Sequence, residues 1–89
     1  LKTFAKILYG GLPPASDEKA VAHFTKALQI KPDYINHHLE MGITYEAMKQ
    51  WEAARAEYRK VAELPIGAFN DQQHKNEAAE RLAKILDKK

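Results

Sequence analysis

A short internal repeat limits the possible folds of this 89-residue chain more than any other feature of its sequence. A pattern of one small, one aromatic and one small or branched side chain occurs twice, with an offset of 34 residues at each position: Ala20, Phe24 and Ala27, then Ala54, Tyr58 and Val61. Recurrence at such a period is typical of folds that stack one supersecondary unit on the next. Because antiparallel helices approach closely where a small residue faces a large aromatic one, the repeat predicts stacked helical pairs.

The rest of the chain predicts helices and no strands. Apolar residues recur at helical spacing, and the alternation of half-buried strands is absent. Helices are expected at about 1–9, 17–30, 34–48 and 51–63, with a last helix, apolar on one face, within 69–89. A tight turn is expected near Lys49 and Gln50. The predicted N-caps are Ser16 and Asp33, and Asn70 or Asp71 for the last helix.

Gly42 lies in the middle of a predicted helix, where glycine costs about 1 kcal/mol relative to alanine. Its presence predicts that a neighbouring helix approaches closely at that point.

The repeat and its surroundings resemble the tetratricopeptide repeat family. Met41, Gly42 and Tyr45 match the family's L-G-x2-Y run, and Ala54 and Tyr58 follow at the expected distance. The family's usual tryptophan is replaced by His38, so a packing role is expected for this histidine. The resemblance implies an all-α, right-handed solenoid: a degenerate repeat at 1–34, a second repeat at 35–68 and a C-terminal capping helix at 69–89.

A second resemblance is narrower. Several short motifs are similar to the regulator of microtubule dynamics family: residues 11–16, Lys19-Ala20, residues 24–27, Pro32-Asp33-Tyr34, Leu64-Pro65, Asp71 and Glu77-Ala78-Ala79. This resemblance implies that the segment is the C-terminal end of a longer helical-repeat domain. The start at Leu1, without an initiator methionine, agrees with a cut through a longer chain, and the sequence leaves the compartment open. Eukaryotic members of that family are associated with microtubules and organelle membranes.

Composition narrows the function classes. The chain carries 14 basic and 12 acidic residues, a formal net charge of +2, and the basic residues are scattered along it. Nucleic-acid binders usually concentrate positive charge on one face, so no nucleic-acid partner is expected. The sequence lacks cysteine, which excludes disulfides and thiolate metal sites. It also lacks an apolar run long enough for a transmembrane segment.

No catalytic or metal-binding motif is recognisable in the sequence. Four histidines are present, but none forms the H-x3-H pair of a helical zinc site. Three of them are expected at the surface: His23, His37 and His74. The single serine, Ser16, is explained by capping, and no phosphate-binding loop is found. The sequence therefore predicts a protein that is not an enzyme and holds no cofactor or metal.

The tetratricopeptide resemblance also implies a binding surface, because the first helix of each pair lines a concave face in such arrays. Six residues are expected there: Asn36, Leu39, Glu40, Ile43, Glu46 and Ala47. Leu39 and Ile43 stand where several family members use Lys and Asn to hold a C-terminal carboxylate, so that binding mode is not expected. These two residues are either an exposed apolar anchor for a partner helix or are covered by an upstream helix.

The predicted function is a non-enzymatic scaffold that binds a protein or peptide on this concave face. Two alternatives stay open. The chain can be a structural or self-associating module, since short repeat arrays often need further units for stability. It can also hold a lipid or another small ligand in an apolar groove that involves Leu39, Ile43 and Met48.

Overall fold

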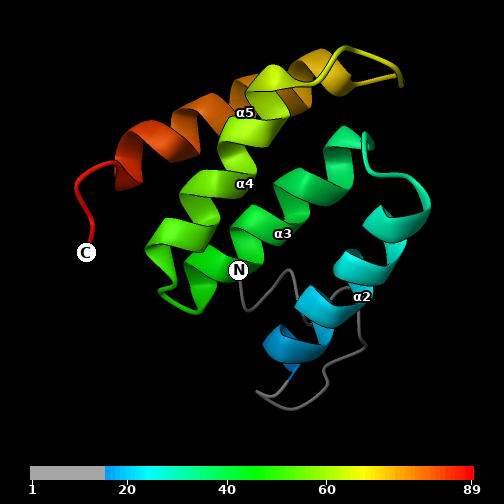
Figure 1. The fold of residues 1–89 in the computed structure, drawn as a ribbon. Helices are drawn as coiled ribbons and strands as arrows, with labels where there is room; N and C mark the ends of the chain where they lie inside the picture. Colours follow the sequence, from blue (N-terminus) through cyan, green and yellow to red (C-terminus); the bar gives the residue numbers. More distant parts are fainter. Residues whose placement is uncertain (1–15) are drawn as a thin grey trace.

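The computed structural model describes residues 16–89, and every regular element in that range is an α-helix. Their bounds are α2 Ser16–Ile30, α3 Ile35–Ala47, α4 Trp51–Glu63 and α5 Asp71–Ile85 (Figure 1). The expected all-α class is therefore confirmed for these residues. The helix predicted at 1–9 lies outside the described residues. The division into repeats at 1–34, 35–68 and 69–89 stays a prediction.

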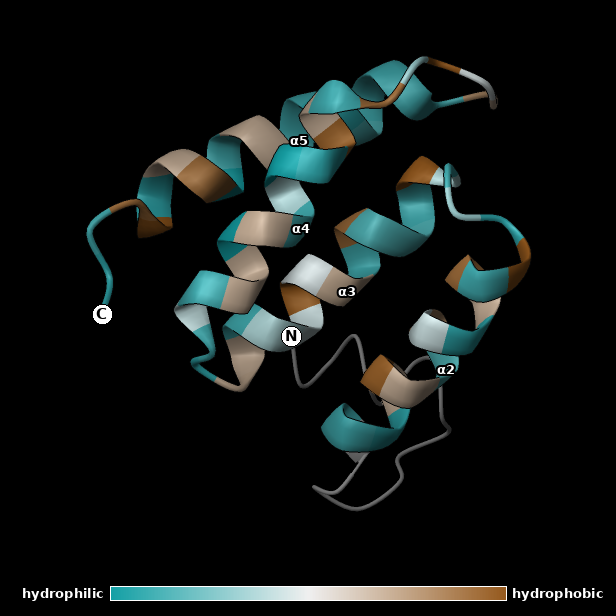
Figure 2. Cartoon of the chain, in the orientation of Figure 1, coloured by the Kyte–Doolittle hydropathy of each residue, from teal (hydrophilic) through white to brown (hydrophobic). Residues whose placement is uncertain are grey.

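Consecutive helices run in roughly opposite directions, and α3 lies at the centre (Figure 1). It packs against α2 on one side and α4 on the other, and α5 contacts both α3 and α4. On each helix apolar residues are separated by hydrophilic ones, as expected where one stripe of a helix is buried (Figure 2).

The buried side chains form two clusters, and the repeated residues are central to both. One cluster joins α2 to α3 through Ala20, Phe24 and Met41. The other joins the last three helices: Ile35, Leu39, Ile43, Ala54, Tyr58, Val61, Ala78 and Ile85. Of the six repeated residues, five are buried and Ala27 is half-buried. The internal repeat thus marks the core, since those positions face the neighbouring helix.

The close approach predicted at Gly42 is confirmed. A Cβ atom added to Gly42 would lie 2.5 Å from Cε1 and 2.8 Å from Cδ1 of Tyr58. Side-chain carbons do not approach to such distances, so the ring of Tyr58 occupies the space that any other residue at position 42 would need. The small residue on α3 and the aromatic residue on α4 together set the spacing of these two helices.

Two of the predicted helix caps were wrong in detail. The N-cap of α3 is Tyr34, without a side-chain cap hydrogen bond, and not Asp33. The turn uses one residue more than expected, because the Tyr34 N–H bonds to the carbonyl of Lys31. Asn70 occupies the N-cap position of α5 with a left-handed backbone, but its side chain makes no cap hydrogen bond either.

The carboxylate of Asp71 points back into the α4–α5 connection. Its Oδ2 atom accepts hydrogen bonds from the backbone N–H groups of Gly67 at 2.8 Å and Ala68 at 2.6 Å. These bonds lower the pKa of Asp71, because they stabilise the ionised carboxylate. Asp71 therefore shapes the loop before α5 and does not cap the helix.

Candidate functional site

Helices α3 and α5 enclose a surface groove that contains most of the predicted binding residues. This groove is a pocket of about 300 Å³ lined by Asn36, Leu39, Glu40 and Ile43 from α3, and by His74, Glu77 and Arg81 from α5. We call it the α3–α5 groove. Glu46 is joined to its rim through Arg81, whose Nη1 atom lies 3.6 Å from Glu46 Oε1. Ala47 is half-buried and does not line the groove. The role of these residues in binding stays a prediction.

Leu39 and Ile43 do not protrude from this surface. They are 3% and 6% exposed and belong to the buried cluster shared with α4 and α5. The expectation of an exposed apolar anchor was therefore wrong, because the described cluster that buries them includes residues of α4 and α5. The physical reason is that α5 folds back over α3. That an upstream helix also covers Leu39 and Ile43 stays a prediction. Both residues now form an apolar floor below the polar rim of the groove.

The rim carries a short chain of polar contacts. Arg81 Nε donates to Glu77 Oε2 at 2.9 Å, and the hydroxyl of Tyr58 donates to Glu46 Oε1 at 2.6 Å. Burial, together with this bond to Glu46, raises the pKa of Tyr58, so the phenol stays protonated. The Glu46 carboxylate thus accepts a hydrogen bond from the Tyr58 phenol of α4 and pairs with the Arg81 guanidinium of α5, and these two contacts fix its position.

Glu40 is the carboxylate of the groove that forms no ion pair within residues 16–89. It is half-buried, and its Oε1 accepts a hydrogen bond from Asn36 Nδ2 at 3.4 Å. Burial raises the pKa of this carboxyl group. Glu40 and Glu77 against Arg81 give the lining a formal charge of −1 with His74 neutral, and Glu46 beside Arg81 adds one further negative charge at the rim. The groove is therefore acidic.

The histidines are distributed differently from the expectation in two cases. His38 is buried, as its packing position predicted, with Nδ1 2.7 Å from Glu57 Oε1 and Nε2 2.6 Å from the carbonyl oxygen of Pro32. His23 is exposed, whereas His37 and His74 are half-buried and only partly accessible at the surface. Within residues 16–89, no group of three or more His, Cys, Asp or Glu side chains is placed to hold a metal ion.

The structure also contains further pockets that were not foreseen from the sequence. One, of about 400 Å³, opens between α2 and α4, with His38, Met41 and Glu57 among its lining residues. Another, of about 810 Å³, lies where the α3–α4 turn meets the C-terminal tail. Both combine residues that are far apart in the chain. No local motif indicates such a site, because only the packing of the helices brings these residues together.

These features define the class: an all-α protein whose packed, antiparallel helices leave an acidic groove between two of them. Within that class, the family described as Regulator of microtubule dynamics protein 1-3 matches residues 1–86, and the chain belongs to this family. The narrower of the two sequence resemblances is thereby confirmed.

The chain is 28% identical over 88 residues to Regulator of microtubule dynamics protein 1 of Pongo abelii. This alignment covers 98% of the chain and 28% of the relative, so the chain spans little more than a quarter of that protein. No solved structure matches the chain significantly. None of the helices in residues 16–89 has the length and apolar character needed to cross a lipid bilayer.

Proposed function

We propose that this chain is a non-enzymatic protein-interaction module that binds a basic peptide or helix in the α3–α5 groove. The observation that carries the proposal is Glu40, a half-buried carboxylate that lies in the lining of an acidic pocket and forms no ion pair within residues 16–89. Arg81 is already engaged by Glu77 and Glu46, and within residues 16–89 the nearest remaining base of the lining is His74, which forms no ion pair with Glu40.

We further propose that the helices form a tetratricopeptide-like stack, in which α3 and α5 are first helices of successive units. Three features support this arrangement. The core residues recur 34 positions apart, Gly42 lies against Tyr58, and α5 has few buried apolar residues, as a terminal helix would. In such an array the groove between first helices is the natural docking face for a peptide.

The chemistry of the groove favours a lysine or arginine side chain of the partner. The methylene stem of such a side chain packs well on an apolar floor while its charged head meets a carboxylate. Leu39 and Ile43 supply the floor and Glu40 supplies the carboxylate. A hydrogen bond between ionised groups is stronger than one between neutral groups, particularly where water is partly excluded.

The relative's name connects that protein with microtubule dynamics. We extend to this chain only the proposal that its partner is a protein.

Selection of peptides from a random display library tests this proposal. We expect enriched peptides to contain Lys or Arg next to apolar residues, and their affinity to fall at least tenfold in the Glu40→Lys variant. Glu80→Lys is the matched control, because Glu80 is an exposed carboxylate of α5 outside the groove. Backbone NMR shifts should locate the bound peptide at α3 and α5. Peptides that bind elsewhere, or lose affinity equally in both variants, would show that the groove is not the site.

Self-association is a second candidate, and a separate observation favours it. Phe69 and Ile66 in the α4–α5 loop are 91% and 56% exposed, and Ile30 at the end of α2 is 87% exposed. Sedimentation equilibrium decides between the candidates. A monomer supports the peptide-binding module, whereas a dimer that the Phe69→Ser variant dissociates supports self-association through this loop. We do not propose the apolar ligand groove, because Leu39 and Ile43 expose only 3% and 6% of their surface, and Glu40, Glu77 and Arg81 make the lining around that small floor charged.

A further inference from the structure

The C-terminal tail is held against the first turns of α4. Arg55 Nη1 donates to the carbonyl oxygens of Ile85 at 2.9 Å and Lys88 at 2.8 Å. The Nζ atom of Lys88 lies over the ring of Trp51, 5.6 Å from its centroid, which is a cation–π distance. The tail and the α3–α4 turn consequently lie at the same end of the molecule (Figure 1).

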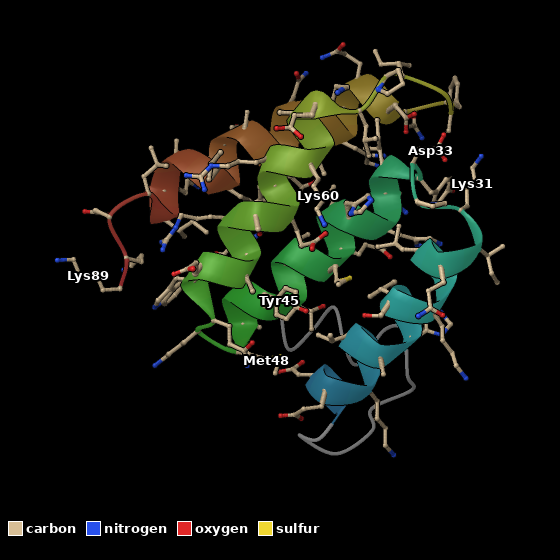
Figure 3. The ribbon with its side chains drawn as sticks, in the orientation of Figure 1. Lys31, Asp33, Tyr45, Met48, Lys60 and Lys89 are labelled. Atoms are coloured by element: carbon tan, nitrogen blue, oxygen red, sulfur yellow. The ribbon has the colours of Figure 1, made fainter. Side chains whose placement is uncertain are left out.

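This arrangement creates a basic pocket of about 810 Å³, which we call the tail pocket. Its charged lining residues are four bases and one acid: Lys49, Arg55, Lys88, Lys89 and Glu52. Four positive charges and one negative charge give a formal charge of +3, which exceeds the +2 of the whole chain. Both segments that form its rim are hydrophilic (Figure 2), and the side chain of Lys89 projects from the tail (Figure 3). Positive charge is therefore concentrated here, although it is scattered in the sequence.

The rim of the tail pocket is fixed by the backbone. Lys49 adopts a left-handed conformation with φ of 61°, its N–H bonds to the carbonyl of Glu46, and the N–H of Gln50 bonds to that of Tyr45. The turn therefore presents Lys49 from a defined position. Gln50, the N-cap of α4, makes no side-chain cap hydrogen bond, so the first N–H groups of α4 add donors to those of the lysines. This addition is secondary, because the lysines already supply the charge.

We propose that the tail pocket binds an acidic peptide segment of a partner protein, whose carboxylates contact Lys49, Lys88 and Lys89. The site is distinct from the α3–α5 groove, which is acidic, so the two surfaces select opposite charges. Arg55 is a positioning residue here, because its guanidinium holds the tail through two carbonyl oxygens. Trp51 is half-buried beneath Lys88. The methyl groups of Ala53 and Ala56 provide apolar lining for a side chain between two carboxylates.

A peptide fits this site better than a nucleic acid. Binding of single strands uses aromatic faces on which bases stack, and Lys88 covers a face of Trp51. Nucleic-acid surfaces also extend as a stripe of positive charge along the phosphates, whereas this charge is confined to one pocket. A short run of Glu or Asp matches three lysines around a pocket of limited size.

Trp51 is the single tryptophan of the chain, so its fluorescence reports directly on the tail pocket. The test is a titration of the chain with a fluorophore-labelled peptide that alternates Glu and Leu, followed by tryptophan emission and by peptide anisotropy. We expect a saturable change in both signals, and an affinity that decreases as salt is added. The double variant Lys88→Glu, Lys89→Glu should weaken binding at least tenfold.

The matched control is Lys19→Glu, Lys26→Glu, which makes the same charge change at exposed positions of α2. This variant should bind within about twofold of the unchanged chain, and circular dichroism should show that both variants stay helical. Three results would overturn the proposal: no saturable change in tryptophan emission, equal losses in the two double variants, or equally tight binding of a single-stranded oligonucleotide of the same charge.

Discussion

The Nδ1 atom of His38 lies 2.7 Å from Oε1 of Glu57, so a histidine of α3 and a glutamate of α4 share a buried hydrogen bond. The other ring nitrogen of His38 faces the carbonyl oxygen of Pro32 at 2.6 Å. A carbonyl oxygen only accepts, so that nitrogen carries a proton, and the bond to Glu57 requires a second one. The pair therefore holds one proton more than a neutral imidazole beside an ionised carboxylate, and it links the α2–α3 turn to α4.

This pair predicts that stability decreases as the solution becomes alkaline. The hydrogen bond to Glu57 raises the pKa of His38 above 6.5, although burial and the charge of Lys60 oppose the shift. A group whose pKa is higher in the folded than in the unfolded state stabilises the folded state. This stabilisation is complete below the pKa of the unfolded state and is lost as the pH rises through the pKa of the folded state. Urea unfolding at a series of pH values should show the loss above the unfolded pKa. In Glu57→Gln this dependence should flatten, and an unchanged slope would contradict the assignment.

The pKa of His37 is shifted in the opposite direction from that of His38, so the effects of the two histidines on stability can be told apart. Burial lowers the pKa of His37, and the neighbouring His23 and His38 lower it further. The contribution of His37 to the stability of the folded state is therefore present above pH 6.5. It is lost as the pH falls through the lower pKa that His37 has in the folded state. An NMR titration of the imidazole protons should show His38 titrating above the unperturbed value and His37 below it. Unfolding in a His37→Gln background isolates the effect of His38, and identical titration of both rings would exclude this account.

The contact between Gly42 and Tyr58 predicts that even a methyl side chain at position 42 lowers the stability of the folded chain. Gly42→Ala should destabilise the chain by up to about 2 kcal/mol, because overpacking costs about 1–3 kcal/mol and the better helix propensity of alanine returns about 1 kcal/mol. Gly67→Ala is the control, since a Cβ there meets nothing within 4 Å. Thermal unfolding measures both changes. Replacing Tyr58 with Leu in the Gly42→Ala background should cost less than in the unchanged chain, and simple additivity would mean that the two residues do not interact.

The Asp71 carboxylate predicts where the α4–α5 connection loses order. Asp71→Ala removes the acceptor of the Gly67 and Ala68 N–H groups, so both amides should exchange with solvent deuterium faster than in the unchanged chain. Asp33→Ala is the control, because that exposed carboxylate of the α2–α3 turn forms only a 3.9 Å pair with Lys31. The two amides should also lose protection as pH falls through the lowered pKa of Asp71. Unchanged exchange in Asp71→Ala would show that the loop holds its shape without this group.

Arg55 predicts how strongly the tail is attached to α4. Arg55→Met removes two hydrogen bonds from a guanidinium to carbonyl oxygens, and we expect a loss of about 1–2 kcal/mol in a partly exposed setting. Release of the tail should also move Lys88 away from Trp51 and change tryptophan emission. Arg59→Met is the matched control, because Arg59 is exposed and makes no hydrogen bond or ion pair with the described residues. Similar effects of both variants would indicate a general charge effect and not an attachment of the tail.

Much of the helical architecture was determined by the sequence itself. The predicted helices at 17–30, 34–48 and 51–63 agree within one residue at each end with Ser16–Ile30, Ile35–Ala47 and Trp51–Glu63. Prolines, glycines and apolar spacing act over a few residues, so they can be recognised without knowledge of the partners. The repeated core residues and the close approach of a neighbouring helix at Gly42 were predicted for the same reason, whereas Tyr58 as the residue in contact came from the structure. Family membership also followed from short motifs.

Only the tertiary structure decided which surfaces are exposed. The sequence could not show that Leu39 and Ile43 would be covered, because the cluster that buries them includes α4 and α5, which begin later in the chain. Likewise, no local signal predicts that Arg55 binds a carbonyl 33 residues away or that Lys49 and Lys88 line one pocket. Periodicity marks the apolar face of a helix, but the choice of helix that packs against it depends on how all the faces fit together. The acidic groove and the basic tail pocket are both products of that packing.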